Sequence, residues 1–203
     1  INRVLYYLSE KNEYNSNNEN SFTPALCNRL DMNTSGLVIA AKNANALRII
    51  NEKIKLKEIK KYYIAIADGI FDKKEDILIS NLVRNNKKVQ INDNGIGKNI
   101  ETHYRVISEK NNRSLLEIEL MTGRTHQIRA QLAHIGHPLT GDVKYGSKKN
   151  KGGYKLISYK LIFSFSSDAC EMNYLNGHTG PLGKGAKHRG VSDTAEEMSD
   201  ETR

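Results

Sequence analysis

The most restrictive feature of the sequence is an alternation of apolar and polar residues in its second half. Residues 102–106 and 116–120 alternate with a period of two, and the pair Asn111-Asn112 lies between them. Alternation of this kind places every second side chain on one face of a β-strand, and Asn favours tight turns. The pattern therefore predicts a β-hairpin whose turn lies at residues 111–112.

Other segments predict further strands and two helices. An apolar run over residues 36–41 predicts a strand buried on both faces. We predict strands at 61–68, 77–79, 89–91 and 159–165, and helices at 43–57 and 125–135. Asn43 and Thr125 are suitable N-caps for the two helices, and Gly136 suits the C′ position of the second. Because strands outnumber helices and mostly follow one another through hairpins, we expect an α+β fold with a largely antiparallel sheet.

Length and charge predict one domain followed by a tail. A chain of 203 residues can bury a hydrophobic core. Residues 178–203 become rich in Gly and then in acidic residues without periodicity, so we predict a domain over 1–177 and a disordered tail. The tail holds four of the 31 basic and five of the 23 acidic residues, which leaves +9 on residues 1–177. This excess favours a polyanionic partner, although a Lys-rich solvated surface has the same composition.

Several classes of protein are not expected from the composition. No apolar run approaches the ~20 residues of a membrane span, and the polar start of the chain does not resemble a signal peptide. Cys27 and Cys170 lack metal-ligand spacing and are predicted to be buried thiols, as in a reducing cytoplasm. No His, Cys or acidic residues have the spacing of a metal site. We therefore expect a cytoplasmic protein without a metal.

A polar loop over residues 28–36 holds a candidate reactive acid. Asp31 follows Arg29 by two residues, and a second Arg-rich segment lies at 123–129. Neither segment contains another acid, so Asp31 has arginines to keep it ionised. An ionised carboxylate on such a loop suits a nucleophile or base facing an anionic substrate. On these residues alone, the alternative is an Asp that only caps a turn.

Three motifs, in this order, resemble the RluA family of RNA pseudouridine synthases. They are Arg-Leu-Asp-x-x-Thr-Ser-Gly at 29–36, Lys-x-Tyr-x-Ala at 61–65, and a segment that begins Gly-Arg-Thr-His-Gln-Ile-Arg at 123–129 and ends at Gly146. The resemblance covers about residues 1–177, with Asn28 where the family usually has His. It implies a curved, mixed, mainly antiparallel sheet flanked by helices, with an RNA-binding cleft. The chain starts inside the family's catalytic domain, so we expect an incomplete N-terminus.

The resemblance implies three catalytic residues. Asp31 matches the catalytic aspartate, and Arg129 matches the arginine that pairs with it, which we expect to hold the carboxylate bidentately. Tyr63 matches the aromatic residue that is expected to stack on the target base and could help to remove the C5 proton, whereas strand parity turns Tyr62 to the other face. The aspartate could add to C6 of uracil or attack C1′ of the ribose. Without the motifs, Tyr63 would be interpreted as a strand core residue and Arg129 as a solvated helix residue.

Four further residues are expected to bind RNA. Arg29 resembles the residue that fills the gap left by a flipped-out base. The other three lie at the start of the second predicted helix, whose amides favour an anion, and are expected to contact the RNA backbone or support the site: Arg124, Thr125 and His126. The isomerisation has no redox step and transfers no external group, so no cofactor is expected.

We therefore predict a monomeric enzyme that isomerises uridine to pseudouridine in structured RNA, with 23S ribosomal RNA as the expected substrate. The alternatives are a synthase acting on tRNA, a non-catalytic RNA-binding relative and a small-molecule nucleosidase. Asp31, Tyr63 and Arg129 occur together, which weighs against the non-catalytic relative because binding alone needs none of them. The net charge and the lack of a second carboxylate beside Asp31 weigh against the nucleosidase.

Overall fold

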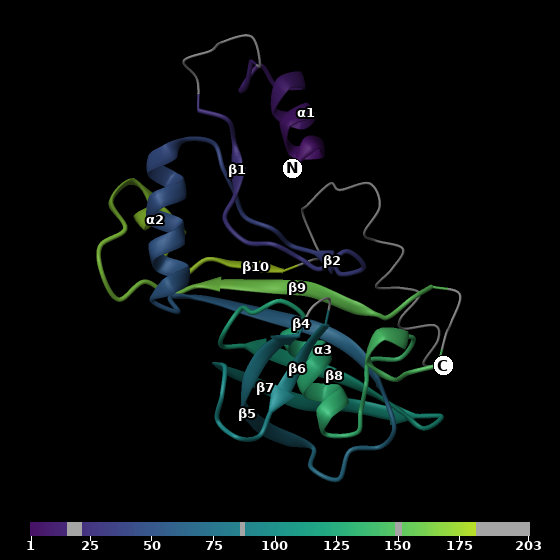
Figure 1. The fold of residues 1–203 in the computed structure, drawn as a ribbon. Helices are drawn as coiled ribbons and strands as arrows, with labels where there is room; N and C mark the ends of the chain where they lie inside the picture. Colours follow the sequence, from purple (N-terminus) through teal and green to yellow (C-terminus); the bar gives the residue numbers. More distant parts are fainter. Residues whose placement is uncertain (16–21, 86–87, 149–151, 182–203) are drawn as a thin grey trace. The chain divides into compact units, whose positions relative to one another are not determined.

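The computed structural model describes residues 1–15, 22–85, 88–148 and 152–181 (Figure 1). They fall into two compact units. The smaller unit comprises Ile1–Leu30, Val38–Ile59 and Ile162–Thr179, and the larger comprises Asp31–Leu37, Lys60–Leu161 and the residues from Gly180 on. Of the predicted tail, residues 182–203 lie outside the described residues. The domain over 1–177 and the disordered tail therefore stay predictions.

In its described residues the smaller unit contains two α-helices, a 3₁₀ helix and a short antiparallel ladder. Its elements are α1 (Asn2–Glu10), β1 (Ala25–Leu26), β3 (Ala40–Ala41), α2 (Ala44–Lys55) and η2, a 3₁₀ helix (Cys170–Leu175), and β1 pairs with β3. Asn43 caps α2 as predicted, because its side chain accepts a hydrogen bond from the Ala46 amide at 2.8 Å. Both cysteines are free thiols, but Cys170 is exposed, so the prediction of two buried thiols is wrong for that residue.

The larger unit is built on a mainly antiparallel sheet. Its strands are β4 (Ile59–Asp68), β5 (Glu75–Asn85), β6 (Lys88–Asn92), β7 (Lys98–Lys110), β8 (Arg113–Leu120) and β9 (Leu156–Phe163). The strand order is β10-β9-β4-β8-β7-β5-β6, where β10 is Thr179–Pro181, and β2 (Ser35–Gly36) pairs with β9 in parallel. Antiparallel pairs join β4 to β8, β8 to β7, β7 to β5 and β5 to β6. The predicted α+β class is confirmed.

The predicted hairpin is confirmed, and the strand predicted over residues 36–41 is wrong. Asn111 and Asn112 both have positive φ, 53° and 56°, as a two-residue turn of type I′ requires. Over residues 36–41 the chain forms the ends of two short strands, β2 and β3, in place of one strand, and Val38 between them is 40% exposed. The apolar run is divided because β2 pairs with β9 whereas β3 pairs with β1.

The second helix, α3 (Gln127–His134), starts later than predicted. His126 occupies the N-cap position with φ 54°, and Thr125 is exposed and does not cap the helix. The buried side chain of Gln127 instead fixes the segment before the helix, because its oxygen accepts hydrogen bonds from the Arg124 amide at 3.1 Å and the Thr122 hydroxyl at 2.9 Å. At the other end Gly136 has φ 89°, which confirms its predicted role at C′.

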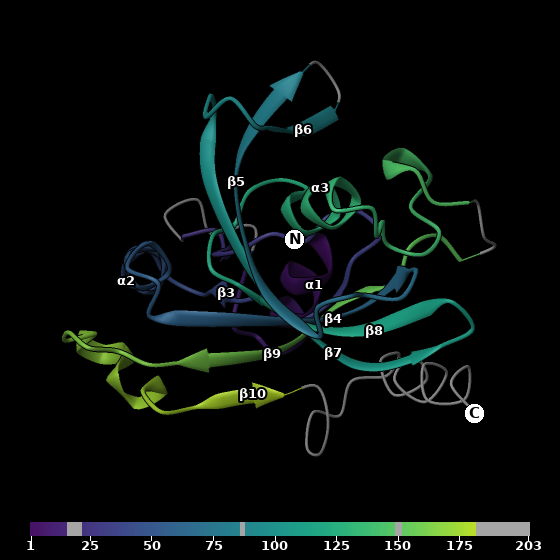
Figure 2. The same ribbon diagram turned by 90° about the horizontal axis from the view of Figure 1, so that it is seen from below.

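Two buried glutamines fix α3 on the sheet. Gln131 accepts a hydrogen bond from Thr102 of β7 at 2.6 Å and donates to the Leu78 carbonyl of β5 at 2.9 Å. Gln127 donates to the hydroxyl of the same Thr102 at 2.9 Å. Figure 2 shows the long strands β5 and β7 curving around this helix. A core cluster of Leu82, Val89, Ile100, Ala130 and Tyr145 lies beside it.

Within the described residues, no helix has the length and apolarity needed to cross a membrane.

Candidate active site

Asp31 lies in the loop that leads into β2, in the larger unit. The loop turns tightly, because the Thr34 amide donates to the Asp31 carbonyl at 2.9 Å. It is then attached to β9 through the parallel pairing of Gly36 with Ser158 and a hydrogen bond from the Leu37 amide to the Ser158 carbonyl at 2.8 Å. The Asp31 side chain keeps 23% of its surface exposed, so a ligand can reach it.

Arg129 of α3 reaches Asp31, although Asp31 is not its closest partner. Arg129 Nη1 lies 3.5 Å from Asp31 Oδ2. Its Nε and Nη2 donate to the two carboxylate oxygens of Asp142 at 2.7 and 2.9 Å. The expected bidentate pairing with Asp31 is therefore wrong, because Asp142 occupies that edge of the guanidinium. Asp142 is a second carboxylate on the same guanidinium, but it binds the edge away from Asp31, so the expected lack of a carboxylate beside Asp31 is not contradicted.

Arg129 is also enclosed by aromatic rings. The guanidinium carbon lies 4.3 Å from the ring centre of Tyr154 and 5.0 Å from that of Tyr145, distances typical of cation–π contacts. The side chain is 8% exposed, and that of Asp142 only 2%. Burial alone would lower the pKa of Arg129, but the hydrogen bonds and charge of Asp142 outweigh it and raise the pKa above its ordinary value. Arg129 is thus a fixed buried cation, not the solvated helix residue of the alternative interpretation.

His126 is the third polar group near Asp31. Its Nε2 lies 3.9 Å from Asp31 Oδ2, and its Nδ1 lies 3.0 Å from the Tyr145 hydroxyl. That hydroxyl also donates to the Val89 carbonyl at 3.2 Å. Burial and the nearby charge of Arg129 lower the pKa of His126, while burial raises the pKa of Tyr145 to about 12. Both side chains are therefore neutral near pH 7.

Tyr63 of β4 is almost fully buried, at 5% exposure. Burial raises its pKa, and the negative charge of Asp31 adds to the increase. Near neutral pH it is a protonated phenol, which suits stacking and hydrogen-bond donation better than proton abstraction.

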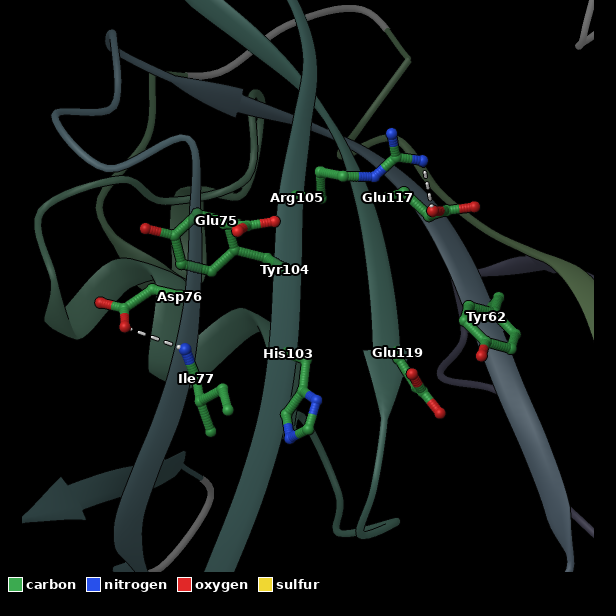
Figure 3. Close-up of a pocket in the computed structure, with 9 residues that line it drawn as sticks. All are labelled: Tyr62, Glu75, Asp76, Ile77, His103, Tyr104, Arg105, Glu117 and Glu119. Atoms are coloured by element: carbon green, nitrogen blue, oxygen red, sulfur yellow. Dashed lines mark hydrogen bonds and ion pairs between the residues drawn. The ribbon is translucent and has the colours of Figure 1, made fainter.

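Tyr62, the preceding residue, lies on the other face of the sheet as predicted. There it lines a hollow of about 480 Å³ over β4, β8, β7 and β5 (Figure 3). Two of the carboxylates in this hollow have these cationic partners: Glu117 binds Arg105 at 2.8 Å, and Glu119 lies 3.8 Å from Lys60. Burial would raise the pKa of Glu117, but hydrogen bonds from Arg105 and Tyr159 and the charge of Lys160 outweigh it and lower the pKa to about 2. An acid held this firmly in its charged form does not suit proton transfer at neutral pH.

The remaining predicted site residues are exposed. Arg124 and Thr125 lie on the surface just before α3, and Arg29 lies on the surface of the smaller unit. Their roles in RNA binding stay predictions. In the part of the chain that the structure describes, no three His, Cys, Asp or Glu side chains are grouped to hold a metal ion.

Comparison with known proteins identifies the family. The family model described as RNA pseudouridylate synthase matches residues 4–134. The chain belongs to this family. The resemblance of its motifs to the RluA synthases is thereby confirmed.

Two curated synthases illustrate the similarity. The chain is 40% identical over 137 residues to the uncharacterized RNA pseudouridine synthase YhcT of Bacillus subtilis, covering 66% of this chain and 44% of that protein. It is 35% identical over 167 residues to the ribosomal large subunit pseudouridine synthase D of Borreliella burgdorferi. This match covers 79% of this chain and 50% of that protein. The chain therefore spans half or less of the length of these relatives.

Solved structures of the family share the fold. Human RNA Pseudouridylate Synthase Domain Containing 4 has a TM-score of 0.66 at 21% identity, over 80% of this chain and 74% of that one. Human RNA Pseudouridylate Synthase Domain Containing 1 has a TM-score of 0.63 at 20% identity, over 87% of this chain and 80% of that one.

Sequence reasoning missed three residues of this synthase-family site. Asp142 and Tyr145 lie inside the third motif, so the sequence pattern could have pointed to them as site residues. The pattern alone did not show that they surround Arg129. Tyr154 lies outside the motifs and became evident only from its contact with Arg129.

Proposed function

We propose that this protein isomerises uridine to pseudouridine in structured RNA, with Asp31 as the nucleophile. The observation that carries the proposal is the ion pair of Asp31 with the buried Arg129, 3.5 Å apart, at the residues where the family has its catalytic pair. A buried cation keeps a nearby carboxylate ionised, and only the ionised form is nucleophilic.

The reaction needs one carboxylate and no external group. The bond between N1 of uracil and C1′ must break, the uracil must turn, and C5 must bond to C1′. If Asp31 attacks C1′, the electron pair of the N1–C1′ bond leaves with uracil and a glycosyl ester forms. C5 then attacks C1′, the carboxylate leaves, and the C5 proton is lost while N1 gains one. If Asp31 adds to C6 instead, the ester is replaced by a ring adduct.

The surrounding residues support either route. Arg129 stabilises the carboxylate each time Asp31 regains its negative charge. Tyr63, as a neutral phenol, stacks on the base. Arg29 takes the place of the flipped nucleotide, and the RNA backbone lies against the segment before α3, namely Arg124, Thr125 and His126.

The proposed substrate is large-subunit ribosomal RNA. Several of the relatives carry that RNA in their names, and the basic excess of the chain suits a polyanion. We further propose that the protein acts as a monomer in the cytoplasm. A synthase for tRNA is the alternative within the same chemistry.

Mapping pseudouridines in ribosomal and transfer RNA from cells with and without the gene tests the proposal. One or more sites should disappear with the gene, and return with the wild-type gene but not with Asp31→Asn. Purified Asp31→Asn protein should fold and bind RNA like the wild type. Pseudouridine formation by this variant near the wild-type rate would remove Asp31 from the mechanism, and an unchanged map in every RNA would overturn the proposed activity.

A further inference from the structure

We infer that Asp142 is a positioning residue, which acts through Arg129 to set the state of Asp31. The inference rests on the proposed function. Asp142 is the closest partner of Arg129, with two hydrogen bonds of 2.7 and 2.9 Å, whereas Asp31 lies 3.5 Å away on the other side of the guanidinium. Arg129 thus bridges the two acids, with its Nε and Nη2 on Asp142 and its Nη1 toward Asp31.

The guanidinium has little freedom to move. A bidentate arginine–carboxylate pair fixes the plane of the guanidinium as well as its position. Here Tyr154 lies over the guanidinium at 4.3 Å and Tyr145 at 5.0 Å, and the carboxylate of Asp142 is 2% exposed. A pair this deeply buried is not weakened by solvent as a surface salt bridge is. Nη1 is left directed toward Asp31.

This arrangement limits what Arg129 can do to the nucleophile. Charge-assisted hydrogen bonds are usually about 2.7–2.9 Å long, so the 3.5 Å separation from Asp31 is a looser contact. Arg129 thereby stabilises the charge of Asp31 without binding both of its oxygens. A carboxylate bound bidentately would have to break strong hydrogen bonds before attacking carbon. Asp142 occupies the edge of the guanidinium that would otherwise form them.

The loop that carries Asp142 is anchored to the end of β4. Asp68 accepts hydrogen bonds from Thr140 Oγ1 at 2.6 Å and from Ser147 Oγ at 2.5 Å. Within the loop, the Ser147 amide donates to the Asp142 carbonyl at 3.1 Å, and the Asp142 amide donates to Leu139 at 2.9 Å. Asp142 is therefore held from both sides, which a positioning residue requires.

A double-mutant cycle tests the inference, with Asp142→Asn, Arg129→Lys and the double variant measured in steady-state and single-turnover assays on RNA. Asn keeps the size of the side chain but loses the charge and one acceptor. A displacement of about 1 Å can lower a rate about 100-fold, so we expect Asp142→Asn to lower kcat about 100-fold. KM should change less than about threefold, because Asp142 lies behind Arg129.

The cycle separates positioning from a purely structural role. If Asp142 acts through Arg129, its loss should have little further effect in the Arg129→Lys background, because coupled residues are not additive. Independent, multiplicative losses would overturn the inference. Thr140→Val is the matched control, since it weakens the same loop and keeps the carboxylate. Below their melting temperatures, Thr140→Val should remain far more active than Asp142→Asn, and equal losses would also overturn the inference.

Proton NMR of the Arg129 Nε–H gives a result that does not need turnover. The group should exchange slowly with water in the wild type and rapidly in Asp142→Asn. Fast exchange in the wild type, or no change in the variant, would overturn the inference even with an active enzyme. If the wild-type protein forms no pseudouridine in any RNA, the proposed function fails, and the exchange measurement alone decides whether Asp142 holds Arg129.

Discussion

Gly36 lies so close to the backbone of Ser158 that a Cβ at position 36 would stand 2.2 Å from the Ser158 carbonyl oxygen. Its φ of +115° also lies in a region that side chains with a Cβ rarely adopt. This contact belongs to the parallel pairing of β2 with β9, five residues after Asp31. Glycine at this position therefore allows the loop of the proposed nucleophile to attach to the sheet.

Gly36→Ala should lower both stability and turnover. Backbone strain and overpacking each cost about 1–3 kcal/mol, so we expect thermal or urea denaturation to show a loss of roughly 2–6 kcal/mol. Gly95→Ala is the control, because Gly95 has φ +77° but nothing within 4 Å of its added Cβ. The control should lose less stability and keep full activity. Equal effects of the two substitutions would contradict the importance of the Ser158 contact.

Arg129→Lys should leave the fold intact and lower pseudouridine formation strongly, by about 100-fold if the charge is displaced by about 1 Å. Lys keeps the positive charge but cannot bind Asp142 bidentately while also facing Asp31. Circular dichroism and single-turnover rates on the same RNA check the two halves of the prediction. Turnover at the wild-type rate would show that the planar guanidinium is not needed.

Acid should destabilise the smaller unit through Glu58. Its buried carboxylate lies 2.8 Å from Lys53 and accepts a hydrogen bond from the Ser166 amide at 3.0 Å, and these contacts lower its pKa from 4.5 to about 2. A lowered pKa in the folded state stabilises the protein above the unfolded pKa, and this contribution is lost as the pH falls from about 4.5 to about 2.

Glu58→Gln should remove that acid-dependent loss and also lower the melting temperature at pH 7, because Lys53 would remain buried without a carboxylate partner. Melting temperatures measured between pH 7 and pH 2 check both effects. Glu52→Gln, on the exposed side of α2, is the matched control and should behave like the wild type. Parallel pH curves for Glu58→Gln and the wild type would exclude Glu58 as the titrating group.

RNA affinity should fall as salt is added, because each phosphate contact releases counterions. Replacing a lysine or arginine that contacts phosphate should reduce the slope of log K against log salt by about 0.7–0.9. We expect this for Arg124→Gln. Lys73→Gln should leave the slope unchanged, since Lys73 is already paired with Asp76 at 2.9 Å. Binding that does not depend on salt would mean that the basic residues form only a solvated surface.

Features set by short-range patterns were predictable from the sequence. The turn at Asn111-Asn112 and the opposite faces of Tyr62 and Tyr63 both follow from the two-residue period of a strand. The N-cap at Asn43 depends on an acceptor three residues before the amide that it binds. Local geometry is sufficient for each of these, so tertiary contacts did not alter them.

Features set by distant partners were not predictable. Residues 36–41 have the composition of one buried strand, but their two ends pair with different strands. Thr125 has the chemistry of an N-cap, but α3 starts at Gln127 with His126 at the N-cap position, and the buried side chain of Gln127 binds the segment before the helix. Asp31 and Arg129 were recognised from motifs, whereas the pairing of Arg129 with Asp142 depends on how a loop folds back on α3. Spacing along the chain contains no information on that choice.

The loop between Leu139 and Ser147 also limits how this protein can be engineered. Within these nine positions, Asp142 binds Arg129, Tyr145 contacts His126 and Ser147 binds Asp68. An inserted or deleted residue would shift at least one of these three attachments out of reach. The turn that contains Gly95 meets α3 through the exposed ion pair of Asp93 with His134 at 3.1 Å, and exposed turns of this kind tolerate insertions. Tags and fused domains therefore belong at that turn, and the length of the Leu139–Ser147 loop must be kept.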